Sequence, residues 1–215
     1  MNGLKRGAIG LLGTLLLVAA GASMWFWFTP VGVNNYVNKV TLQLAIDSPE
    51  LLTYLGAIDN TPLDFHSGKL ADYTKEEEER SIAKLRNARE GLDDYGPDGL
   101  SGQELLTWKI AAWFFDDQLR QAELRYSGYR VNQISGVTVN MPQFLTDTHV
   151  IKNKKSVRRY LSRLAEFGRV LRETHERVTD DRANGVIPPD FVIEKALVGM
   201  NKFIEGGAAE NPLVT

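Results

Sequence analysis

Residues 7–28 form an apolar run without a charged side chain, and this run constrains the chain more than any other feature. Lys5 and Arg6 precede it, and the next charged residue is Lys39. At roughly 1.5 Å per residue, a helix of this length rises about 33 Å, enough to span a hydrocarbon core of about 30 Å. The run therefore predicts a transmembrane helix, with the membrane as a partner through residues 7–28.

A cleaved signal peptide is the alternative to an anchor. The sequence AGA at residues 20–22 has the small-x-small pattern of a signal-peptidase site, but the aromatic residues Trp25–Phe28 that follow favour a membrane interface. Under both interpretations the basic residues stay in the cytoplasm. We expect the inner (cytoplasmic) membrane as the location, with a cytoplasmic N-terminus and the bulk of the chain in the periplasm. Residues 1–30 are then the anchor or signal peptide, and residues 31–215 the exported helical domain.

Composition excludes several classes of function. A net charge of -2 gives no reason to expect nucleic acid as a partner. The absence of cysteine excludes disulfides, thiolate metal sites and a cysteine nucleophile. The balance of apolar and charged residues is that of a folded, globular protein.

Helical periodicity and capping patterns predict a mainly α fold, an α-helical bundle. Ser48 followed by Pro49 is typical of a helix start, and Thr74 with Glu77 has the spacing of a capping box. Further helices are expected from Ser101 to about Tyr126, from about residue 154 to Asn184, and over residues 191–205. Residues 56–74 have no sustained period and predict a loop. The helix that ends near Tyr126 is expected to be the core helix, buried on more than one face.

Residues 132–149 interrupt this pattern and predict one short extended, β-like segment near 130–149. The segment is rich in β-branched residues, and its only ionisable groups are Asp147 and His149. Such a strand can bind a peptide through its backbone. Residues that would line such a substrate cleft are Asn132, Gln133, Gly136, Asn140 and His149, with amides for hydrogen bonding and a glycine for close backbone approach. Pro142 would end the strand. A structural β-hairpin or crossing loop packed on helices is the alternative.

The histidines and carboxylates predict no catalytic residue and no metal site in this chain. His175 and Glu176 begin the HExxH pattern of zinc enzymes, but position 179 is Thr, so the second ligand is missing. His66 is expected to face solvent in a loop. His149 either stabilises a turn or lies in a cleft. Adjacent Asp116 and Asp117 are expected to be a solvated carboxylate and a partner for arginine, rather than general acids.

Four segments in order resemble a known family. They are NQISGVTVNMPQFL with the following H.IKN, RYLSRLAEF, ANGVIPPDFVIEKAL, and FI......ENPL. Together they resemble the N-terminal part of the bacterial domain of unknown function 885 family, over roughly residues 45–215. The resemblance implies a helical zinc metallopeptidase of the HExxH type, with an HE-x-x-PGHH-like motif in the C-terminal half of complete members.

That motif does not occur in these 215 residues. We therefore expect no cofactor in this chain, zinc only in the full-length protein, and a fragment that is inactive alone. The partners that the resemblance implies are the remainder of its own polypeptide and a peptide substrate. The function expected is the N-terminal region of a membrane-anchored, exported, zinc-dependent peptidase-like hydrolase. The alternative is a non-enzymatic helical envelope protein that binds a partner.

Overall fold

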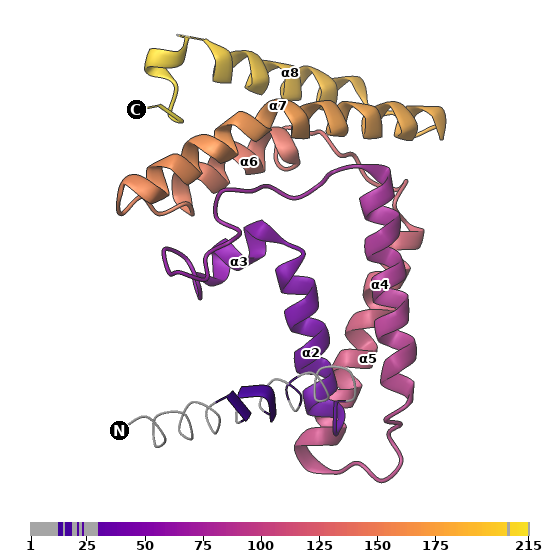
Figure 1. The fold of residues 1–215 in the computed structure, drawn as a ribbon. Coiled ribbons are helices and arrows are strands. Elements are labelled where there is room, and N and C mark those ends of the chain that lie inside the picture. Colours follow the sequence, from indigo (N-terminus) through magenta and orange to yellow (C-terminus); the bar gives the residue numbers. More distant parts are fainter. Residues whose placement is uncertain are drawn as a thin grey trace, which may run out of the picture. The chain divides into compact units, whose positions relative to one another are not determined.

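The computed structural model describes residues 13, 14, 16–18, 21, 23, 30–205 and 207–214. Over these residues the chain is mainly α-helical, as predicted (Figure 1). The helices are α2 (Val33–Ile46), α3 (Pro49–Leu55), α4 (Lys75–Asp93), α5 (Gly102–Glu123), α6 (Val137–Asp147), α7 (Lys154–Ala183), α8 (Asp190–Ile204) and the short 3-10 helix η1 (Ala208–Glu210).

Most of residues 7–28 lie outside the described residues, and the predicted transmembrane helix falls there. No helix in the part that the structure describes has both the length and the apolarity to cross a bilayer.

The chain divides into two compact units. The smaller unit contains described residues up to Gln43 together with Asn87–Asp116, and the larger unit contains Leu44–Arg86 together with the described residues from Asp117 onward. Helices α2, α4 and α5 each contribute one end to each unit.

Tyrosine and tryptophan hydrogen bonds hold the smaller unit together. The hydroxyl of Tyr36 on α2 donates to the carbonyl of Ala88 on α4 at 2.7 Å, and the indole of Trp108 on α5 donates to the carbonyl of Leu92 at 3.2 Å. Burial raises the pKa of Tyr36 to about 12, so the hydroxyl keeps its proton. Gly91 lets α2 approach α4, because a Cβ there would lie 2.4 Å from the Tyr36 hydroxyl.

The core of the larger unit forms where α6 packs on α7 (Figure 1). Leu70, Met141, Phe144 and Val170 are buried in contact with one another, and Tyr73, Val137 and Phe167 pack around them. This cluster joins the loop before α4 to both helices. Helix α8 lies beside α7, since residues of both line one cavity.

The prediction of an extended segment near 130–149 is wrong, because most of these residues form helix α6. Backbone pairing is limited to a single antiparallel bridge between Val131 and Gly136. Met141, Phe144 and Leu145 recur at helical spacing and are all buried. Burying such side chains is worth about 1.5–3 kcal/mol each, which outweighs a β preference of about 1 kcal/mol. Pro142 removes one backbone donor but does not end the helix.

Helix α5 is less buried than predicted. Ala111, Ala112 and Phe115 are buried, whereas Trp113 is 65% exposed and Ile110 56% exposed. The acidic pair follows the expected pattern. Asp116 accepts a hydrogen bond from Arg89 Nε at 2.8 Å and Asp117 accepts one from Gln121 at 2.7 Å, and both hydrogen bonds are exposed.

Candidate functional site

A cavity of about 400 Å³ in the larger unit is the best candidate for a ligand site. Helices α3, α6 and α7 and the segments that precede α4 and α6 form its walls. The lining combines charged and polar side chains with an apolar surface: Glu50, Tyr54, Leu70, Tyr73, Arg130, Gly136, Val137, Asn140, Met141, Phe144, Thr174 and Arg177. A mixed lining of this kind is typical of a site that orients a small ligand.

Helix α3 places Glu50 at the cavity. Ser48 caps the helix by accepting a hydrogen bond from the Leu51 amide at 3.3 Å, and Pro49 occupies the first helical position. Glu50 then lies in the first turn, where a carboxylate suits the helix dipole. Its Oε1 accepts a hydrogen bond from the Ala71 amide at 2.9 Å, while its Oε2 is buried without a hydrogen-bond partner.

Gly136 shapes the opposite wall. Its φ of 99° lies in the region that favours glycine, and a Cβ there would come within 2.4 Å of the Arg130 carbonyl oxygen. The close backbone approach expected at this glycine therefore occurs within the chain itself. The Gly136 carbonyl accepts a hydrogen bond from the Asn140 amide at 2.8 Å, which starts α6 at the cavity edge.

Two arginines of the lining are held by carboxylates. Arg130 Nε donates to Asp181 at 2.8 Å, and its Nη2 lies 3.5 Å from Glu78. Arg177, whose side chain is 4% exposed, pairs with Glu78 and lies 3.9 Å from Asp180. Each guanidinium thus faces two carboxylates, and Nη1 of Arg177 is buried without a hydrogen-bond partner among the described residues.

Arg163 lies next to this cavity and is fully buried, with none of its surface exposed. It donates to the Lys69 carbonyl at 2.9 Å, to Thr53 Oγ1 at 2.7 Å and to His149 Nδ1 at 3.0 Å. Its guanidinium also stacks 4.8 Å from the centre of the Phe144 ring. Burial lowers the pKa of Arg163 to about 10, which still leaves the side chain charged at neutral pH. One residue thus joins α3, α6, α7 and the loop after α3.

His149 is buried rather than free in a cleft. Because its Nδ1 accepts from Arg163, the proton sits on Nε2, which donates to the Ser156 carbonyl at 3.1 Å. Burial is the main cause that lowers the pKa of His149, and the charge of Arg163 adds to it. Ser156 in turn belongs to the capping box that starts α7 with Asn153. The turn-stabilising role considered from the sequence matches these contacts.

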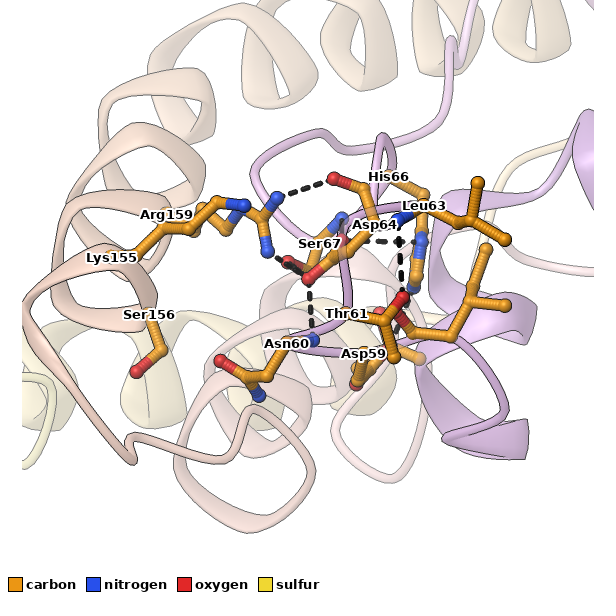
Figure 2. Close-up of polar contacts among 12 residues, drawn as sticks. Asp59, Asn60, Thr61, Leu63, Asp64, His66, Ser67, Lys155, Ser156 and Arg159 are labelled. Atoms are coloured by element: carbon orange, nitrogen blue, oxygen red, sulfur yellow. Dashed lines mark hydrogen bonds and ion pairs between the residues drawn. The ribbon is translucent and has the colours of Figure 1, made fainter. Parts of the chain in front are cut away.

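The loop after α3 is closed by a buried polar cluster around Asp64 (Figure 2). Asp64 accepts hydrogen bonds from the amide of Asn60 at 2.7 Å and the hydroxyl of Ser67 at 2.9 Å, and it pairs with Arg159 of α7. His66 is fully buried beside it, with Nε2 2.7 Å from Asp59, so the prediction that His66 faces solvent is wrong. Burial lowers the pKa of His66. Loop residues become buried here because α7 covers them, which local composition does not reveal.

The five residues predicted to line a cleft do not share one site. Gly136 and Asn140 line the cavity of about 400 Å³, whereas Asn132 and Gln133 line a separate one of about 360 Å³ beside α8. His149 borders a third, of about 550 Å³.

Sequence reasoning missed Glu50, Arg163 and Arg177. A charged residue at an apolar helical position is the signal for Arg163 and Arg177, since both fall on the buried stripe of α7 with Val170 and Thr174.

These features define a class: a mainly α-helical domain with a cavity whose lining combines two arginines and a glutamate with apolar side chains. The chain belongs to the family described as bacterial protein of unknown function (DUF885), whose profile matches residues 49–215. Neither the comparison with curated proteins nor that with solved structures gives a match.

Proposed function

We propose that this chain supplies part of the substrate-binding wall of a peptidase-like hydrolase. The observation that carries the proposal is the cavity of about 400 Å³, whose lining includes Gly136, the amide side chain of Asn140 and the carboxylate of Glu50. Amides and backbone groups at the edge of a half-apolar cavity are the groups that hold a peptide in place. The resemblance to helical zinc peptidases supports the same reaction class.

The described residues do not fit zinc. No group of three or more His, Cys, Asp or Glu side chains within them is arranged to hold a metal ion. The closest arrangement is His66 with Asp59 and Asp64, but Asp64 is already engaged by Arg159 and Ser67. We therefore derive no catalytic step through a metal, and in this proposal zinc is held by residues other than those described here.

The chain's own residues have a binding role in this proposal. Glu50 is oriented by the Ala71 amide, and Asn140 lies on the first turn of α6 with its side chain exposed. They would hold a substrate against Leu70 and Met141 and restrict its orientation. The proposal includes export and tethering at the cytoplasmic membrane through residues 7–28.

Metal analysis and kinetics on the protein made from its complete gene test the proposal. We expect about one zinc per chain and hydrolysis of a peptide substrate. Asn140→Trp narrows the cavity and should raise KM with little change in kcat, because it removes binding shared by substrate and transition state. Asp147→Trp, at the exposed end of the same helix, is the matched control and should change neither. Protein without stoichiometric metal, or without peptidase activity, overturns the hydrolase.

The alternative is a non-enzymatic envelope protein that binds a partner. The exposed apolar residues of α5, Leu106, Ile110 and Trp113, favour it, because a monomer seldom leaves several large apolar side chains of one helix in water. The same metal analysis separates the two functions. If the protein is folded and monodisperse without metal, the result supports the partner-binding alternative. If it hydrolyses a peptide only with zinc bound, the result excludes this alternative.

A further inference from the structure

The charges around the cavity of about 400 Å³ identify the class of ligand that it accepts. Two arginines line it, which at first suggests an anion. Arg130, however, faces Asp181 and Glu78, and Arg177 faces Glu78 and Asp180. Lys75 is the third cation of this network and pairs with Asp180 at 3.1 Å. Three cations are matched by three carboxylates, so this network has no excess positive charge to attract an anion, although Nη1 of Arg177 forms no hydrogen bond among the described residues.

In the network that contacts Tyr73 and Ala71, carboxylates outnumber cations. Arg169 hydrogen bonds to both Glu166 and Glu173, and it also donates to the Ala71 carbonyl at 3.2 Å. Glu173 in turn accepts from the amide of Tyr73, a residue of the lining. The segment that carries Leu70 and Tyr73 is therefore held by a network with one more negative charge than positive.

Glu50 adds a carboxylate that no cation contacts within the part of the chain that the structure describes. Its Oε1 is bound by a neutral amide and its Oε2 is buried without a partner. Arg163 is a buried cation that interacts electrostatically with Glu50, but it directs its hydrogen bonds to Lys69, Thr53 and His149 instead. A buried carboxylate oxygen without a donor is unfavourable by about 1–3 kcal/mol or more, and a positive charge bound close to the carboxylate offsets part of this cost.

The rest of the lining is apolar or aromatic. Leu70, Val137, Met141 and Phe144 form the apolar wall, and the rings of Tyr54 and Tyr73 stand beside Glu50 in the lining. Aromatic faces next to a carboxylate favour an ammonium group. Apolar surface favours an adjoining hydrocarbon side chain.

Resting on the proposed function, we infer that the cavity binds the free amino end of a peptide, with the ammonium group at Glu50 and an apolar first side chain against Met141 and Phe144. The cavity then selects substrates by their positive end. The carboxylate end of a peptide is disfavoured, because both arginines of the lining already form ion pairs with carboxylates.

Three small leucine derivatives that differ in the charge of their two ends test this inference on the full chain. Leucinamide carries an ammonium group and no carboxylate, N-acetylleucine carries a carboxylate and no ammonium group, and N-acetylleucinamide is neutral. We expect leucinamide to bind at least about tenfold more tightly than the other two, as for one charge-assisted hydrogen bond. Nuclear magnetic resonance titration measures the affinities, and the amide signals of Gly136 and Asn140 report binding at this cavity.

Glu50→Gln is the variant that isolates the charge, since it keeps an oxygen for the Ala71 amide. It should abolish the preference for leucinamide, whereas Glu176→Gln, an exposed glutamate on α7, should preserve it. If Glu50→Gln does not fold, the comparison of the three probes on the wild-type chain still decides. Equal binding of all three, or a preference for N-acetylleucine, overturns the amine selectivity but leaves the cavity as a ligand site. Absence of any shift at Gly136 and Asn140 overturns both this inference and the proposed cleft.

Discussion

Arg163 donates a hydrogen bond to Nδ1 of His149 across 3.0 Å, and both side chains are buried. The contact requires a neutral imidazole, because a protonated Nδ1 would direct a second donor at the guanidinium. It also gives a buried cation an uncharged acceptor in place of a carboxylate. Charge on Arg163 and neutrality of His149 are therefore coupled, and the stability of the larger unit depends on both.

Acid should weaken the fold through His149. Burial holds its pKa below the ordinary value of 6.5, so the unfolded chain binds protons more readily than the folded one as the pH falls. Neutral His149 therefore contributes its full share to the free energy of unfolding above pH 6.5, and this share is lost as the pH falls below that value. Urea denaturation at about pH 7.5 and about pH 5.5 measures the loss. His149→Gln should reduce this difference, whereas His175→Gln, an exposed residue of α7, should leave it unchanged. Equal losses in all three proteins contradict the assignment.

Removal of the buried guanidinium should destabilise the protein strongly. Arg163→Ala leaves the Lys69 carbonyl and Thr53 Oγ1 without their donor and opens a cavity beside Phe144. We expect a loss of about 3–5 kcal/mol in the free energy of unfolding. Arg172→Ala, exposed on the same helix, should stay within about 0.5 kcal/mol of the wild type. Denaturation curves compare the two, and a loss below about 1 kcal/mol for Arg163→Ala would show that its contacts are dispensable.

Substitution of two glycines by alanine should change the free energy of unfolding in opposite directions. At Gly136 the positive φ and the Arg130 carbonyl leave no room for a Cβ, so Gly136→Ala should cost about 1–3 kcal/mol and disturb the cavity edge. At Gly199, inside α8, nothing lies within 4 Å of an added Cβ, so Gly199→Ala should stabilise by about 0.5–1 kcal/mol. Thermal unfolding of both variants is the measurement. A stabilising Gly136→Ala would mean that the bridge to Val131 is absent in solution.

The pair of Asp64 and Arg159 should show strong coupling. The Asp64 side chain is fully buried and also binds Asn60 and Ser67, so Asp64→Asn leaves the guanidinium without its charge partner. A double-mutant cycle with Arg159→Met should give a coupling free energy of about 1–3 kcal/mol. Asp98→Asn, exposed in the smaller unit, should show none with Arg159→Met. Additive effects at Asp64 and Arg159 would rule out the pair as the closure of the loop.

Local chemistry was sufficient to predict most helices. Ser48 with Pro49 marks the start of α3, and Thr74 caps α4 by accepting the Glu77 amide at 3.3 Å, because these bonds join residues that are neighbours in the chain. The same reasoning failed for α6, where β-branched residues favoured a strand. Met141, Phe144 and Leu145 form a helix because a core built from distant segments, Leu70 and Val170, buries them.

The sequence by itself determined the helical class, the helix starts and the family to which the chain belongs. Only the tertiary structure decided that Arg163, His66 and Asp64 are buried, that Glu50 lies across a cavity from Gly136, and that the predicted cleft residues separate into three cavities. The physical reason is the sequence separation over which each interaction acts. Caps and periodicity act within one or two helical turns, whereas burial and the pairing of charges depend on contacts between residues about a hundred positions apart, such as Arg159 and Asp64.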